Sequence, residues 1–119
     1  MAMIESWGQE LVIDFTGANN KVCDKDAILE FGIQLIKAID MEAWGEPQIE
    51  YFGKDNKKGW TYSQLITTSN ICFHFCDDGA GYGNIFSCKP IDAIVVRNLV
   101  QSYFEPNKTK QKFFLRGDW

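Results

Sequence analysis

The sequence predicts a small α+β fold, a two-layer sandwich in which two helices cover one face of a mainly antiparallel sheet. Two observations on the chain lead to this class. Two segments carry apolar residues at helical spacing, and six shorter segments alternate in polarity or are rich in β-branched and aromatic residues. With 119 residues, 45% of them hydrophobic, the chain suits a single domain spanning residues 1–119. The expected order of elements is β-α-β-β-β-β-α-β.

The first strand and the first helix have clear local signals. Residues 9–16 read QELVIDFT, whose apolar side chains alternate with others as in a half-buried strand. After a turn cluster, Asp24 or Asp26 could cap a helix that runs to about Met41. Its core-facing stripe is Ile28, Phe31, Leu35, Ile36 and Ile39.

Four strands should follow, at residues 48–52, 60–68, 70–75 and 82–87. The second helix should begin at Pro90, which suits a first helical turn, and end at Pro106. Its apolar stripe is Ile91, Ile94, Val95, Leu99 and Tyr103. Residues 112–115 are the last expected strand.

Charge and composition narrow the function classes. The net charge is −4 and no long basic run occurs, so we expect no nucleic-acid partner. The apolar runs are too short to cross a membrane, and the N-terminus does not resemble a signal peptide. Four cysteines without a secretory context suggest reduced thiols and a cytoplasmic protein.

The chemistry of the chain gathers in residues 65–88, LITTSNICFHFCDDGAGYGNIFSC. This stretch holds the only histidine and three of the four cysteines. Ser69, His74 and Cys88 provide a hydroxyl, an imidazole and a thiol, which are the usual nucleophile, base and proton donor of acyl chemistry. A serine that attacks the preceding carbonyl can break the chain and leave a pyruvoyl group, whose ketone accepts electrons as CO₂ leaves a bound amine substrate.

TTSNICFHF followed by NIFSC resembles the core of the small bacterial and archaeal S-adenosylmethionine decarboxylases. The resemblance implies that Ser69 cleaves its own chain after Thr68 and becomes the pyruvoyl group. It also implies that His74 assists this cleavage and that Cys88 donates the proton in the decarboxylation. GQELVIDFTG at the start and LRG near the end extend the resemblance over nearly the whole chain, and it implies the fold of that family.

The same resemblance assigns substrate-binding residues. Phe52 matches an aromatic residue of the family that stacks on adenine, and Thr61 matches a serine of the family. The loop between these two positions is about three residues longer in this chain than in the family. Thr68 and Asn70 stand beside the serine where the family has glutamate and histidine.

The resemblance further implies decarboxylation of S-adenosylmethionine for polyamine and spermidine synthesis, by a homodimer with sites between subunits. Trp7, Phe52 or Trp60 could bind adenine in such a site.

Three alternatives remain open from the sequence. The chain could be an uncleaved lyase that breaks S-adenosylmethionine by intramolecular attack, as some phage enzymes do, and this chemistry would not need Ser69. It could also be a decarboxylase of another amino acid, or a non-catalytic regulatory subunit that activates a cleaved partner.

Strand geometry sets two limits on the site. Cys72, His74 and Cys76 are zinc-ligand types on one strand face, with Cys88 nearby, but residues four apart on a strand lie about 13 Å apart, so we expect no metal. Ser69 and His74 are five apart, so an unbroken strand places them on opposite faces. The two can face one site only if the strand bends or breaks near Ser69-Asn70, and the self-cleavage hypothesis requires such a bend.

Overall fold

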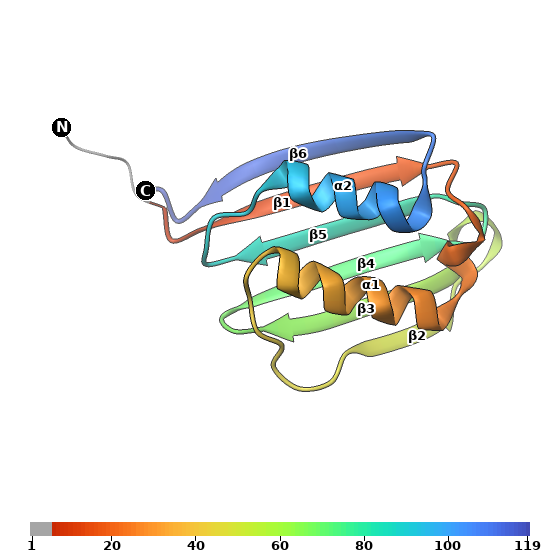
Figure 1. Ribbon diagram of the computed structural model, residues 1–119, viewed down its shortest axis with the longest axis horizontal. Helices are drawn as coiled ribbons and strands as arrows, with labels where there is room; N and C mark the ends of the chain where they lie inside the picture. The colour runs from red at the N-terminus through yellow and green to blue at the C-terminus, as the bar shows by residue number, and fades with distance from the viewer. Residues whose placement is uncertain (1–5) are drawn as a thin grey trace.

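The computed structural model describes residues 6–119 and has two layers, a six-stranded sheet and two helices on one of its faces (Figure 1). The strand order is β2-β3-β4-β5-β1-β6, and every neighbouring pair is antiparallel. The predicted fold class and the predicted order of elements are therefore confirmed.

The elements have the following bounds. The strands are β1 (Gly8–Thr16), β2 (Gln48–Phe52), β3 (Gly59–Ile66), β4 (Ser69–Cys76), β5 (Gly81–Ser87) and β6 (Lys108–Arg116). The α-helices are α1 (Lys25–Ala38) and α2 (Ala93–Phe104), and the 3₁₀ turns are η1 (Asn20–Cys23) and η2 (Asp55–Lys57).

Aspartate caps decide where both helices begin. The Asp24 side chain accepts the backbone N–H groups of the first turn of α1. Asp92 does the same for α2, so this helix starts three residues later than the predicted start at Pro90. Glu105, in the left-handed conformation, ends α2 directly before Pro106. The buried residues of α2 are Val96, Val100 and Phe104, whereas Ile94 is 70% exposed, so the predicted apolar stripe of this helix was wrong by one position.

Two strands also differ from the prediction by more than one residue at an end. β6 spans nine residues, because it pairs with β1 along its whole length, from Gly8 opposite Arg116 to Thr16 opposite Lys108. β3 ends at Ile66, because the next two residues turn the chain into β4.

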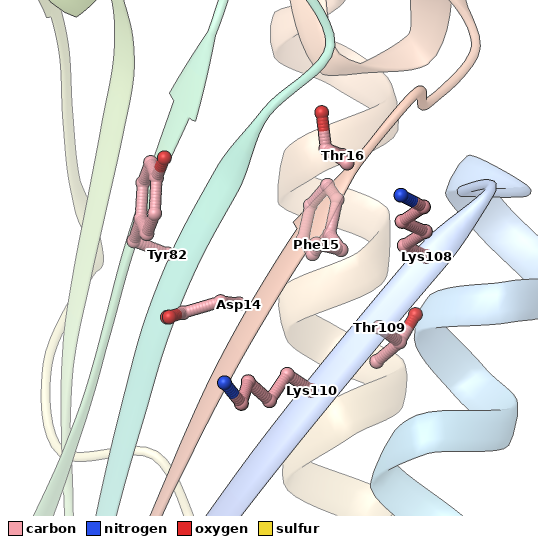
Figure 2. Close-up of a pocket in the computed structure, with 7 residues that line it drawn as sticks. All are labelled: Asp14, Phe15, Thr16, Tyr82, Lys108, Thr109 and Lys110. Atoms are coloured by element: carbon pink, nitrogen blue, oxygen red, sulfur yellow. The ribbon is translucent and has the colours of Figure 1, made fainter.

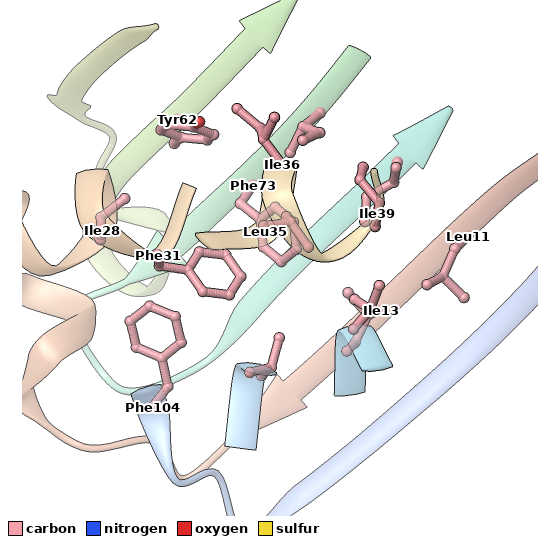
Figure 3. Packing of buried hydrophobic residues seen from close by; sticks show 14 of the residues in the cluster. Leu11, Ile13, Ile28, Phe31, Leu35, Ile36, Ile39, Tyr62, Phe73 and Phe104 are labelled. Carbon is pink, nitrogen blue, oxygen red and sulfur yellow. The ribbon is translucent and has the colours of Figure 1, made fainter. Parts of the chain in front are cut away.

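The hydrophobic core lies between the sheet and the helices (Figure 3). Phe31 of α1 occupies its centre, with its ring centroid 5.3 Å from that of Phe73 on β4 and 5.1 Å from that of Phe104 on α2. Tyr62, fully buried beneath α1, has its pKa raised to about 12 because burial disfavours the phenolate. This packing fixes the helices on one face.

The other face of the sheet, here called the open face, carries no helix formed by residues 6–119 (Figure 1). Thr61, His74 and Tyr82 stand side by side across β3, β4 and β5 on this face. In residues 6–119 no helix is long and apolar enough to span a membrane.

Candidate functional site

Ser69 and Cys88 lie together at the turn between β3 and β4, although they are nineteen residues apart. Ser69 is the first residue of β4, and its Oγ accepts a hydrogen bond from the backbone N–H of Cys88 at 2.9 Å. The antiparallel pairing of β4 with β5 brings the end of β5, and therefore Cys88, to this place. Ser69 is nearly buried, with 8% of its surface exposed.

Thr68 joins this turn to β4 in an unusual conformation. Its φ of 59° is in the left-handed region, which a β-branched residue rarely adopts. Such a conformation costs on the order of 1–3 kcal/mol and persists only where the surrounding structure imposes it. The peptide bond between Thr68 and Ser69 therefore begins at a strained residue.

The Thr68 side chain also acts on the Cys88 thiol. Its Oγ1 lies 2.8 Å from Cys88 Sγ. This hydrogen bond stabilises the thiolate and is the largest cause of a lowered pKa for Cys88, with smaller contributions from Ser69 and from the Lys89 charge, while partial burial opposes the shift. Cys88 therefore releases a proton more readily than an ordinary thiol.

Two recesses flank the turn. The Cys88 recess, of about 210 Å³, is lined by Asp40, Met41, Glu42, Thr67, Thr68, Cys88 and Lys89. The Trp44 recess, of about 370 Å³, is lined by Trp44, Leu65, Ile66, Thr67, Thr68 and Ser69. The loop between α1 and β2 contributes to both.

His74 has a different set of partners. Its Nε2 lies 2.6 Å from the backbone oxygen of Lys57, which can only accept, so Nε2 carries the proton. In the neutral ring Nδ1 then accepts from the Thr61 hydroxyl at 2.6 Å. The ring centroid of Phe52 lies 6.1 Å from that of His74. Phe52, Thr61 and His74 thus form a group on the open face.

The structure separates His74 from Ser69. β4 is continuous from Ser69 to Cys76, so the bend near Ser69-Asn70 that the sequence-based hypothesis required is absent, and that expectation was wrong. Five residues of strand span roughly 16 Å, and the two side chains lie on opposite faces. We call Thr68, Ser69 and Cys88 the Ser69 half-site. We call Phe52, Thr61 and His74 the His74 half-site.

Asn70 lies on the open face between Leu65 and Phe86 and is half-buried. It is adjacent to the Ser69 half-site in sequence, but its side chain belongs to the opposite face from that of Ser69.

The three aromatic residues considered for adenine differ in accessibility. Trp7 stacks on Phe86 with ring centroids 5.5 Å apart and is 55% exposed, and Phe52 is 56% exposed. Trp60 donates its indole N–H to the backbone oxygen of Cys23, and its strand position places it on the helix side of the sheet. Trp7 and Phe52 are therefore the ones that offer a free ring surface.

Metal ligands do not converge in the part of the chain that the structure describes. No group of three or more His, Cys, Asp or Glu side chains lies close enough to hold an ion in residues 6–119. All four cysteines are free thiols, and burial is the largest cause of the raised pKa of Cys72 and of Cys76.

Two features of the surface were not predicted from the sequence. One is the Trp44 recess. Its only signal in the sequence is a tryptophan directly before Gly45-Glu46-Pro47, a segment that interrupts regular secondary structure. The other is a hollow of about 570 Å³ over β5, β1 and β6, where Asp14, Tyr82 and Lys110 lie on the open face (Figure 2). None of the predicted site residues lines this hollow.

Comparison with known proteins gives a consistent result. The family model described as S-adenosylmethionine decarboxylase matches residues 9–117. The crystal structure of the adenosylmethionine decarboxylase from Aquifex aeolicus superposes with a TM-score of 0.79, covering 95% of this chain and 92% of that one. At 16% sequence identity this second likeness concerns the fold alone. No curated protein matches the chain in sequence.

Proposed function

Because the chain belongs to the S-adenosylmethionine decarboxylase family, we propose that it decarboxylates S-adenosylmethionine with a pyruvoyl group made from its own Ser69. The product would serve polyamine synthesis, including that of spermidine. One observation carries the proposal: the strained Thr68, the Ser69 hydroxyl and the Cys88 thiol meet at one turn.

The residues at the turn fit the formation of this group. A bond that starts at a left-handed, β-branched residue stores strain, and cleavage between Thr68 and Ser69 would release it. A pyruvoyl group supplies a ketone that binds an amine and withdraws electrons as CO₂ leaves. The group would occupy the first position of β4, beside Cys88 and between the two recesses.

Cys88 is suited to return a proton to the substrate carbon. Its thiol borders the Cys88 recess, and its pKa is lowered chiefly by the Thr68 hydroxyl. Efficient general acids have a pKa near the working pH, so a lowered thiol pKa favours proton donation. The chain thus has a proton donor beside the predicted cleavage position.

His74 would act across a subunit boundary. Within one chain it lies roughly 16 Å along β4 from Ser69, on the other face. A homodimer in which the open face of one copy contacts the Ser69 turn of the other would supply His74, Thr61 and the adenine-stacking Phe52 from the partner. This arrangement would complete the Ser69 half-site without a metal and without any bend in β4.

The intact mass of the purified chain under denaturing conditions tests self-cleavage. We expect two fragments divided between Thr68 and Ser69, with the C-terminal fragment carrying the pyruvoyl mass. A single chain near 13.6 kDa would contradict self-processing.

Ser69→Ala is the variant that distinguishes the alternatives. A pyruvoyl enzyme should lose both cleavage and CO₂ release from S-adenosylmethionine. A lyase should keep its turnover, and a regulatory subunit should show no turnover in either form and should co-purify with a partner.

A further inference from the structure

The Cys88 recess is unfavourable for an additional anion. It carries two carboxylates, Asp40 and Glu42, and one ammonium group, Lys89. The Lys89 ammonium already donates to the backbone oxygen of Asp40 at 3.0 Å and lies 3.8 Å from its carboxylate. The recess is therefore net negative, with its single cation already paired, and would repel another carboxylate.

The Trp44 recess has the opposite character. Its walls are the apolar side chains of Trp44, Leu65 and Ile66, and only the residues of the turn add polar groups. Trp44 is 71% exposed and Leu65 is 57% exposed. A contiguous exposed apolar surface of this kind often marks a binding site, and this one borders Ser69.

Trp44 is held in a fixed place beside β3. Its backbone N–H donates to the Leu65 oxygen at 2.8 Å. The Gln64 side chain, only 2% exposed, donates to the backbone oxygens of Trp44 at 3.3 Å and Gly45 at 3.1 Å. A buried amide thus anchors the loop and holds the Trp44 backbone beside the recess.

We propose that, in the complex that precedes bond formation, the Trp44 recess receives the α-carboxylate of the substrate while the substrate amine lies beside residue 69. This inference rests on the proposed function. The carboxylate and the amine share one carbon, so the carboxylate must enter a recess next to residue 69, and charge disfavours the Cys88 recess. An apolar recess strips water from a carboxylate at a cost in free energy, and departure as neutral CO₂ removes that cost.

The test compares two ligands in a Ser69→Ala background, where neither is turned over. Calorimetry gives the affinities for S-adenosylmethionine and for its decarboxylated form, which lacks only the carboxylate. We expect the decarboxylated form to bind at least as tightly. Leu65→Lys should shift the affinity ratio toward S-adenosylmethionine by about tenfold or more, because its ammonium pairs with the carboxylate.

Ile94→Lys is the matched control, since Ile94 is 70% exposed on α2 and lines neither recess. This variant should leave the ratio unchanged. If Leu65→Lys fails to fold, Trp44→Lys is the alternative variant that places an ammonium group in the recess. Three outcomes would overturn the inference. The affinity ratio could stay unchanged with a lysine in the recess, the protein could prefer S-adenosylmethionine before the lysine is introduced, or neither ligand could bind.

CO₂ release by the unmodified chain separates this inference from the proposed function. If the unmodified chain releases CO₂ but a lysine in the recess leaves the affinity ratio unchanged, the chain is a decarboxylase and the Trp44 recess does not bind the carboxylate. If the affinity ratio changes as expected but no CO₂ is released, the recess binds the carboxylate and the chain is not a decarboxylase.

Discussion

Thr68 combines two properties that rarely occur in one residue. Its backbone is strained, and its hydroxyl lies 2.8 Å from the Cys88 sulfur. The strain acts on the peptide bond to Ser69, and the hydroxyl acts on the thiol. These two effects can be separated by substitution, because one depends on the β-carbon and the other on the oxygen.

Thr68→Val keeps the branched shape and removes the hydroxyl. We expect the pKa of the Cys88 thiol to rise toward its ordinary value, since the hydrogen bond that most stabilises the thiolate is lost. At a fixed pH below that pKa less thiolate is present, so alkylation of Cys88 by iodoacetamide should slow severalfold. Mass spectrometry of the Cys88 peptide across pH measures this, with Thr68→Ser as the control that keeps the hydroxyl. An unchanged pH profile in Thr68→Val would show that the hydroxyl does not set the thiol pKa.

Thr68→Gly removes the steric strain. Relief of the left-handed conformation should raise the free energy of unfolding by about 1–2 kcal/mol. The greater freedom of glycine in the unfolded chain should lower it by about 0.4–1 kcal/mol. In a Ser69→Ala background urea unfolding should therefore show a gain of roughly 0.5–1 kcal/mol. With Ser69 present, self-cleavage should slow.

Thr67→Gly is the comparison for this change, because Thr67 has no positive φ and should only lose stability. Faster cleavage or lower stability in Thr68→Gly would exclude strain as a driving force.

The elements that the sequence predicted well are those with a clear period. Alternation identified β1, and the stripe at helical spacing identified α1. The full length of β6 was missed, because lysines alternate along this edge strand and a charged edge has no apolar period. The role of Trp44 was missed for a similar reason, because a loop residue belongs to no periodic pattern. The resemblance to the family pointed to Ser69, His74 and Cys88. Strand parity showed that an unbroken strand would turn His74 away from Ser69, but the hypothesis required a bend, and β4 has none.

Gly32 controls how closely α1 approaches the sheet. A β-carbon at this position would lie 2.2 Å from the Tyr62 hydroxyl and 2.4 Å from its ring. Gly32→Ala gains about 1 kcal/mol of helix propensity but overpacks a fully buried ring, at a cost of about 1–3 kcal/mol. We expect a net loss of unfolding free energy of roughly 1 kcal/mol in urea denaturation.

Ser102→Ala, an exposed change on α2, should by contrast be neutral or slightly stabilising. A Gly32→Ala variant as stable as the parent would mean that α1 can move away from the sheet without cost.

At the scale of the whole molecule, the two half-sites lie at different places on one protomer. Neither contains all the groups that the proposed self-cleavage and decarboxylation would need, and β4 is a continuous strand, paired with β3 and β5, that does not bring them together. A two-fold dimer uses the same surface of both copies, so each Ser69 half-site can meet the His74 half-site of the partner. Sedimentation should then give a mass of twice 13.6 kDa.

Mixed dimers test this arrangement directly. Cys88→Ala and His74→Ala should each be inactive alone, because every site in either homodimer carries one defect. After the two variants are mixed and allowed to exchange subunits, half of the dimers should be mixed, and each should have one intact site. The activity should return to about a quarter of that of the unmodified protein. Cys88→Ala mixed with Ser69→Ala should stay inactive, because both defects fall in the same half-site and no combination of subunits restores it. No recovery in the first mixture would place His74 and Cys88 in one chain's site despite their separation along β4. Recovery in the second mixture would place Ser69 and Cys88 of one site in different chains.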